Sequence, residues 1–216
     1  MFKPAFVSNI ELSFRKKRSE FLKELAFSLK PPIQILDVGG TMDYWRCVGY
    51  SFFKEFECTL LNIEKELDLD TGFQFTFGDA CDLSRYDDME FDLVLSNSVI
   101  NLVGSFEEQR KMANEIRRVG KRYFVQAPNR FFPLDWRTLI PLFHFLPKKT
   151  QAWLFRQMRV GLYRRIKDYE SSIKRATRVR DLSRREFLEL FPEAKIKSEK
   201  VFGFSKSFIV YYGFNK

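Results

Sequence analysis

The sequence predicts an α/β protein in which helices cover both faces of a mostly parallel sheet. Five short apolar runs of strand-like composition recur up to residue 126, with one helical segment before the first run and another between the fourth and fifth. Strands that alternate with helices are typical of a doubly wound parallel sheet. Two more strand-like runs near the C-terminus predict an antiparallel pair that closes one edge, which makes seven strands. With 216 residues, the chain has the length of one domain, 1–216.

Hydrophobic spacing and stop signals place each element. Apolar residues at helical spacing predict a helix over 13–30, which Pro31 and Pro32 end, and Ser105 with Glu108 forms a capping-box pattern that opens a helix before residue 119. Two further helices are expected, over 151–176 and 183–191. The expected strands are 33–36, 58–63, 73–77, 91–95, 121–126, 195–201 and 206–212.

Composition excludes several classes of protein. A hydrophobic share of 45% with 25 Phe excludes disorder, and the balance of 37 basic to 28 acidic residues gives a net charge of +9. Cys47, Cys58 and Cys81 form no C-x-x-C pair, and His144 is the one histidine, so we expect reduced thiols and no metal site. We see no signal peptide and no apolar run long enough to span a membrane, and we therefore expect a cytoplasmic protein.

Acidic side chains end three of the first four expected strands: Asp37, Glu64 and Asp79. In an open parallel sheet, ligands bind beyond the carboxyl ends of the strands. An acid that ends the second strand can accept hydrogen bonds from both hydroxyls of a ribose. The pattern therefore predicts a ligand that contains a nucleoside.

The turn after the first strand indicates which nucleoside. It contains Gly39 and Gly40 but neither the G-x-G-x-x-G spacing nor a Walker loop, and Asp37 and Asp43 flank it. Two carboxylates would repel a pyrophosphate, whereas they suit a ligand with cationic groups. S-adenosylmethionine carries an ammonium and a sulfonium and fits this requirement.

Residues 35–41, with the sequence I-L-D-V-G-G-T, resemble the first motif of the class I S-adenosylmethionine-dependent methyltransferases, although the second glycine comes one position early. Residues 91–98 are similar to the fourth motif of that family. The resemblance implies a Rossmann-like sheet and S-adenosylmethionine as the cofactor. It also implies cofactor contacts from Asp37, Gly39, Gly40 and Thr41 near the methionine end, Glu64 at the ribose, Asp79 and Ala80 at the adenine, and Ser96 and Asn97 beside the methyl group.

No general base follows from the resemblance. Many relatives place a histidine soon after the fourth motif, where this chain has Asn101. Methyl transfer from a sulfonium is an in-line displacement that depends mainly on holding the two reactants in line. The catalytic residues are therefore unknown at this point, and the candidates by position are His144, Asp135, Asp43 and Tyr44.

Residues 129–180 are expected to form a helical insertion that covers the acceptor site as a lid. From residue 156 to residue 185 there are eleven basic and three acidic residues, beside an apolar stripe typical of an amphipathic helix. This basic helix would face solvent, an anionic membrane or a nucleic acid. A solvated face over a lid helix is the simplest interpretation. Of the other two, the apolar segment 131–147 before the helix favours a membrane or an apolar acceptor over a nucleic acid.

We therefore expect a methyltransferase whose acceptor, a small molecule, a lipid-linked intermediate or a glycan, the residues do not select. Two alternatives stay open. One is an RNA methyltransferase that uses the basic helix. The other is a non-catalytic module that keeps the fold, which the shifted glycine and the missing histidine would suit.

Overall fold

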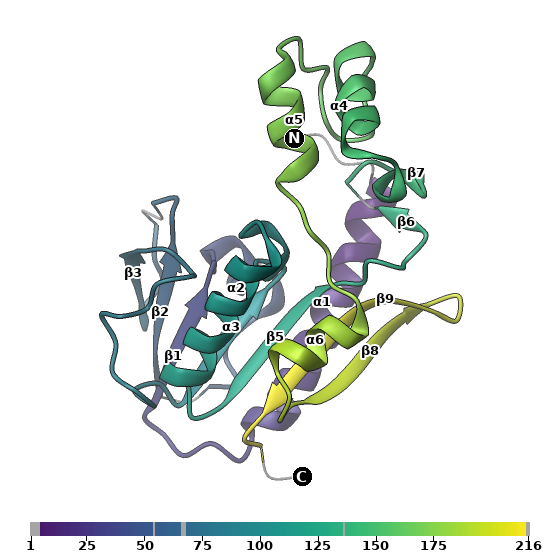
Figure 1. Cartoon of the computed structure of the whole chain (residues 1–216). Helices are drawn as coiled ribbons and strands as arrows, with labels where there is room; N and C mark the ends of the chain where they lie inside the picture. The colour runs from purple at the N-terminus through teal and green to yellow at the C-terminus, as the bar shows by residue number, and fades with distance from the viewer. Residues whose placement is uncertain (1–4, 54, 66–67, 136, 215–216) are drawn as a thin grey trace.

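A computed structural model describes residues 5–53, 55–65, 68–135 and 137–214. Seven strands form one sheet in the order β3-β2-β1-β4-β5-β9-β8 (Figure 1). Neighbouring strands are parallel except where β9 pairs with β5 and with β8, so the predicted doubly wound, mostly parallel sheet is confirmed. The strands are β1 (Ile33–Val38), β2 (Phe56–Asn62), β3 (Phe73–Phe77), β4 (Leu93–Asn97), β5 (Tyr123–Pro128), β8 (Lys195–Val201) and β9 (Phe204–Tyr212).

Two helical layers cover the sheet because successive strand residues point to opposite faces. On one face, α1 (Ala5–Ala26) and α2 (Met42–Val48) bury Leu25 and Trp45 against Ile35. On the other face, α3 (Phe106–Val119) and α6 (Arg184–Leu190) bury Ile116 and Phe187 with Leu36. A short 3-10 turn, η1 (Ile100–Leu102), follows β4.

Serine side chains cap the starts of α3 and α6, and at α6 the cap is a full capping box. The Ser105 hydroxyl accepts from the Glu108 N–H at 3.2 Å, which confirms the predicted start of α3. At α6, Ser183 accepts from the Glu186 N–H, and the Glu186 carboxylate accepts in return from the Ser183 N–H at 2.7 Å. Each cap satisfies a backbone donor that the first helical turn leaves without a partner.

Between β5 and α6 the chain leaves the sheet at the carboxyl ends of its parallel strands and rises above them (Figure 1). We call residues 129–180 the insertion. Its helices pack on each other around a small core of their own, formed by Phe143, Ala152, Phe155, Val160 and Ala176. The insertion contains β6 (Leu134–Asp135), β7 (Ile140–Pro141), η2 (Phe143–Phe145), α4 (Lys148–Gln157) and α5 (Tyr169–Thr177).

The expectation of one long helix over 151–176 is wrong. The backbone is extended at Met158, which ends α4, and Asp168 caps the separate helix α5 by accepting from the Ser171 N–H at 2.6 Å. In the turn between the two helices, Gly161 has φ of +54°, and a Cβ there would lie 2.0 Å from the Thr138 carbonyl oxygen. Only glycine therefore fits where the chain passes that backbone. The apolar spacing continued through this turn, because residues on both sides of it pack on the same small core.

The predicted helix over 13–30 is observed as α1, which begins earlier and ends at Ala26. Within the described part of the chain, no helix has the length and apolar composition that a bilayer span requires.

A buried ion pair attaches α1 to the last strands. The Arg18 guanidinium donates to the Glu199 carboxylate at 2.8 and 3.2 Å, and both side chains are almost fully buried. Glu199 also accepts from the Ser207 hydroxyl, and Arg18 also donates to the Asn97 side-chain oxygen. Removing one partner would leave the other charge buried without compensation.

Replacing Arg18 by Met should therefore lower the free energy of unfolding by about 3–5 kcal/mol in urea titrations. The double variant R18M/E199M should recover most of this loss, because neither charge of the pair remains. The exposed pair of Arg46 with Asp70 provides the control, since R46M should change stability little. A double variant as unstable as R18M would contradict this explanation.

Candidate active site

The turn after β1 brings its backbone against a carboxylate. Asp37 is 2% exposed, and a Cβ at Gly40 would lie 2.3 Å from its Oδ2 atom. Gly39 has φ of +77°, and a Cβ there would lie 2.3 Å from a methyl carbon of Val99. Both positions therefore require glycine, and the turn closes tightly over Asp37.

Burial makes the Asp37 carboxylate costly to ionise. Its Oδ2 accepts one hydrogen bond from the Trp45 indole N–H at 2.8 Å. Burial raises the pKa of Asp37 to about 7, an effect that the Trp45 hydrogen bond opposes. A cation placed beside Asp37 would favour its charged form, so the carboxylate is suited to a positively charged ligand group.

A cavity of about 280 Å³ opens at this turn, and we call it the cofactor cavity. Five of the nine predicted cofactor residues line it, from the turn after β1 and from the end of β4. The lining consists of Arg15, Asp37, Gly39, Gly40, Thr41, Asp43, Tyr44 and Asn97. Thr41 also caps α2, because its side chain accepts from the Tyr44 N–H at 3.4 Å.

The other four predicted residues lie outside this lining. Glu64 is exposed just beyond β2, and Asp79 is exposed just beyond β3, where its carboxylate accepts from the Cys81 N–H at 2.9 Å. Ala80 is buried beside Asp79. Ser96 is buried near the end of β4, and its hydroxyl has no hydrogen-bond partner within the described part of the chain. All four follow or end strands at the same edge of the sheet, and their cofactor roles stay predictions.

Arg15 is a site residue that the sequence did not indicate. It extends from α1 and lines the cofactor cavity together with Asp37 and Asp43. No hydrogen bond or ion pair joins its guanidinium to another residue of the described chain. The cavity thus presents two carboxylates and one available cation, which matches the ammonium, sulfonium and carboxylate of S-adenosylmethionine. The residues present therefore fit this cofactor.

A second cavity, of about 270 Å³, lies between α1, the ends of β4 and β5, β9 and the insertion, and we call it the acceptor cavity. Arg15 and Asn97 line both cavities, so the two lie side by side. Asn101 also lines the acceptor cavity. From the insertion come Phe132, Leu134, Asp135, Arg137 and His144.

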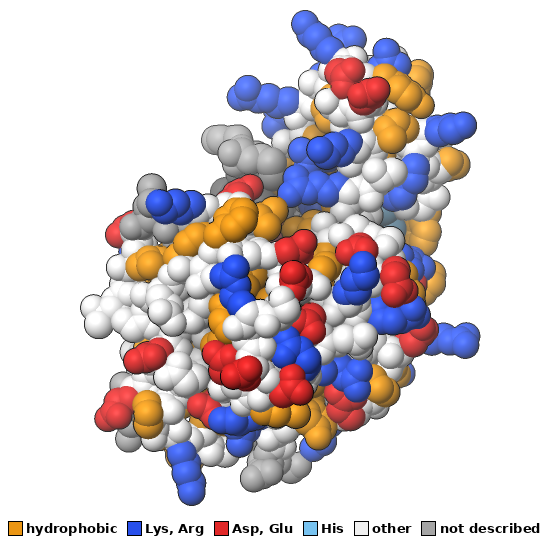
Figure 2. Space-filling model, turned by 60° about the vertical axis from the view of Figure 1, so that its left-hand side comes forward, with side chains coloured by type: hydrophobic (Ala, Val, Ile, Leu, Met, Phe, Trp, Pro, Cys, Tyr) orange, Lys and Arg blue, Asp and Glu red, His pale blue; other side chains and the backbone are white. Residues whose placement is uncertain are grey.

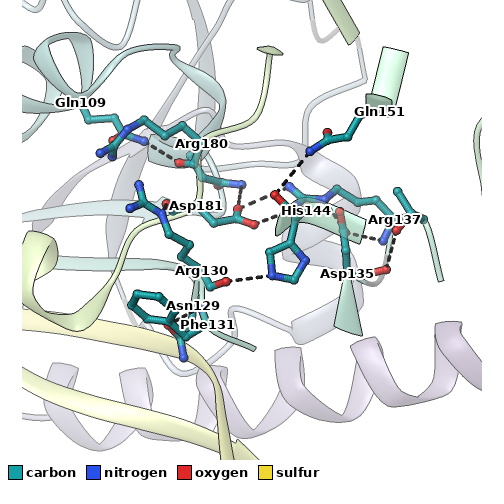
Figure 3. Close-up of polar contacts among 12 residues, drawn as sticks. Gln109, Asn129, Arg130, Phe131, Asp135, Arg137, His144, Gln151, Arg180 and Asp181 are labelled. Carbon is teal, nitrogen blue, oxygen red and sulfur yellow. Dashed lines mark hydrogen bonds and ion pairs between the residues drawn. The ribbon is translucent and has the colours of Figure 1, made fainter. Parts of the chain in front are cut away.

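Ion pairs attach the insertion to the sheet beside this cavity (Figure 3). Asp181 accepts from Arg137 at 2.7 Å and from the Asn101 amide at 3.0 Å. Arg137 also donates to Asp135 at 2.8 Å. The Gln109 amide donates to the Arg180 carbonyl oxygen at 2.7 Å. These bonds join the end of the insertion to α3 and to the segment after β4.

The four candidate bases differ in their surroundings. Asp135 is held by Arg137, while Asp43 and Tyr44 line the cofactor cavity only, and burial raises the pKa of Tyr44 to about 12. His144 Nε2 lies 2.8 Å from the Arg130 carbonyl oxygen, which can only accept, so Nε2 carries the hydrogen (Figure 3). Nδ1 is then the basic nitrogen, and it is buried with no partner within the described residues.

Replacing Asp37 by Asn tests how much the buried charge of Asp37 destabilises the fold. An Asn side-chain oxygen can still accept from Trp45, while the charge is lost. Because the folded-state pKa of about 7 exceeds the ordinary 3.8, ionisation of Asp37 destabilises the fold increasingly as pH rises from about 4 to 7. At pH 8, D37N should exceed the parent in unfolding free energy by on the order of 2–4 kcal/mol.

Urea titrations at pH 5 and pH 8 measure this difference, which should be clearly smaller at pH 5. An equal difference at both values would show that Asp37 is ionised at both and that its burial does not raise its pKa.

Comparisons with known proteins agree with the fold described above. The family described as a methyltransferase domain matches residues 43–123, a segment that contains Glu64, Asp79 and Asn97. An S-adenosylmethionine-dependent methyltransferase structure from Archaeoglobus fulgidus has a TM-score of 0.57 at 11% identity, covering 91% of this chain and 93% of that chain. One from Methanosarcina mazei has a TM-score of 0.51 at 18% identity, covering 85% and 92%. A search of curated protein sequences finds no match.

At these identities the structural likeness establishes the fold alone, and the family match covers 81 of the 216 residues. This chain therefore shares the fold of these solved structures, and its residues 43–123 are similar to a methyltransferase domain.

Proposed function

We propose that this protein is a class I S-adenosylmethionine-dependent methyltransferase that transfers the methyl group to an acceptor held in the acceptor cavity beneath the insertion. The observation that carries the proposal is the position of Arg15 and Asn97, which line both cavities. A donor in one cavity and an acceptor in the other would meet at these two residues. Holding two reactants in contact supplies much of the rate enhancement that such a displacement needs.

The chain's own residues would hold the cofactor by charge and by hydrogen bonds. Asp37 and Asp43 would face the cationic groups of the methionine end, and Arg15 would pair with its carboxylate. Glu64 would accept from the ribose hydroxyls, and Asp79 with Ala80 would bind the adenine. When bound, the cofactor supplies an activated methyl group on a sulfonium.

His144 would accept the proton when the reacting group of the acceptor is a hydroxyl. In the neutral ring, Nδ1 is the nitrogen that can accept a proton because Nε2 donates to Arg130, and the residue lines the acceptor cavity. The Gln151 amide donates to the His144 carbonyl oxygen at 3.4 Å and to that of Leu146 at 2.8 Å, which fixes the backbone of η2. The insertion would also exclude water from the two reactants.

Calorimetry with S-adenosylhomocysteine tests the first part of the proposal. A methyltransferase should bind this product with measurable heat, whereas a non-catalytic module should give none. Incubation with S-adenosylmethionine labelled on the methyl group, followed by separation of lipid, RNA and water-soluble extracts, then identifies the acceptor. Heat without any labelled fraction would contradict methyl transfer.

Replacing Glu64 by Ala should weaken S-adenosylhomocysteine binding by roughly 1–3 kcal/mol, because a charged acceptor for the ribose hydroxyls is lost. Glu57 lies near the opposite end of the same strand and is also exposed, so E57A is the matched control and should bind as the parent does. Equal affinities for the two variants would show that the ribose lies elsewhere.

Replacing His144 by Gln should lower kcat/KM for the labelled acceptor by about 10²–10⁴-fold, the usual contribution of a general base. The Gln amide can still donate to the Arg130 carbonyl, so S-adenosylhomocysteine affinity and thermal stability should stay unchanged. If H144Q retains full turnover, the proton leaves by another route.

A further inference from the structure

The net positive charge of this protein comes from the insertion. Residues 129–180 contain 13 basic and 3 acidic residues, a net charge of +10, whereas the whole chain carries +9. The remaining residues are therefore close to neutral. In Figure 2, acidic and basic side chains are mixed over the lower, sheet-containing part, whereas the upper part carries mainly basic side chains and one acidic group.

Most of these basic side chains form no ion pair within the described part of the chain. On α3, by contrast, Arg110, Arg117 and Arg118 each pair with a carboxylate. Eight exposed basic residues of the insertion form no ion pair with a carboxylate of the described chain. They are Lys148, Lys149, Arg159, Arg164, Arg165, Lys167, Lys174 and Arg178.

Large apolar side chains are exposed beside these charges. Leu142 is 56% exposed, Phe145 49% and Trp153 56%, and the Phe145 ring lies 6.4 Å from that of Phe131, which is also exposed. Trp153 follows Lys149 by four residues on α4, so both side chains lie on one helix face. We call this set the apolar rim: Phe131, Ile140, Leu142, Phe145, Leu146 and Trp153. Figure 2 shows apolar and basic side chains intermixed over the upper part of the molecule.

We propose that the insertion docks on an anionic lipid bilayer, with the apolar rim at the headgroup boundary and the basic side chains on the lipid headgroups. A surface that combines exposed aromatic and aliphatic side chains with unneutralised Lys and Arg matches the two components of such an interface. Phosphate groups of RNA would satisfy the basic residues equally well. Aliphatic side chains such as Leu142 and Leu146 have no partner on RNA, and this favours the bilayer.

The position of η2 connects the docking surface to chemistry. In this one turn, Phe143 belongs to the small core of the insertion, His144 lines the acceptor cavity and Phe145 belongs to the apolar rim. A bilayer at the rim would therefore lie one residue from the proposed proton acceptor. Resting on the proposed function, we infer that the acceptor is an amphiphile, such as a lipid-linked intermediate, that reaches the cavity from the membrane surface.

Vesicle flotation tests the docking directly, with the full chain and vesicles of phosphatidylcholine alone or mixed with phosphatidylglycerol. The protein should float with the mixed vesicles, only weakly with phosphatidylcholine alone, and less at high salt. F145S/W153S and R164E/R165E should each lower the bound fraction at least tenfold.

Matched controls lie on the sheet-containing part of the chain. F202S changes a fully exposed Phe in the turn between β8 and β9, and R184E/R185E makes the same charge change on α6. Both should float as the parent does. If all four variants lose binding alike, or if F145S/W153S binds normally, a specific bilayer surface is excluded.

Two further outcomes would overturn the proposal. Normal S-adenosylhomocysteine binding with no flotation on anionic vesicles would reject membrane docking and leave the proposed methyl transfer intact. Tight RNA binding that R164E/R165E abolishes and F145S/W153S preserves would assign the surface to a nucleic acid. Flotation without S-adenosylhomocysteine binding would instead contradict the proposed function and keep the docking.

Discussion

The site depends on a carboxylate that the fold buries beneath its own glycine turn. Gly40 lies so close to Asp37 that a methyl group would not fit between them, and Trp45 donates the one hydrogen bond that the carboxylate accepts from a described side chain. Buried charge is unfavourable unless a partner compensates it. A protein that keeps Asp37 in this place gains nothing in stability from it. The arrangement becomes favourable when a cation binds, which explains why the cofactor cavity is acidic at this end.

The molecule divides its charges between its two parts. The cofactor cavity combines acidic groups with Arg15 on a part of the chain that is nearly neutral overall, whereas the insertion carries the whole positive excess. Ion pairs around Asp181 and Arg137 connect the two parts beside the acceptor cavity. The proposed cofactor binding and the proposed surface binding would therefore use different side chains, and substitutions can separate them.

Much of the fold follows from local sequence signals. Short apolar runs predict the strands because buried parallel strands need continuous apolar residues, and Ser105 with Glu108 marks a helix start through local hydrogen bonds. The acids at the strand ends lie at one edge of the sheet because parallel strands share their direction. Asp37 and Asn97 line one cavity for the same reason.

Features that depend on contacts between distant segments could not be predicted. The break between α4 and α5 arises where Gly161 meets the backbone of Thr138, and nothing in the local spacing indicates that contact. In the sequence, Arg15 resembles any basic residue on a surface helix. Only the packing of α1 on the sheet brings it to the cofactor cavity. The free nitrogen of His144 likewise depends on the Arg130 carbonyl, which only the folded insertion brings near.

The measurement that tests the central claim most directly is a crystal structure with S-adenosylhomocysteine bound. The acidic turn and Arg15 predict the amino group of the ligand beside Asp37, its carboxylate on the Arg15 guanidinium and its ribose hydroxyls on Glu64. A ligand bound away from the turn after β1, or one whose carboxylate rather than amino group faces Asp37, would contradict the account.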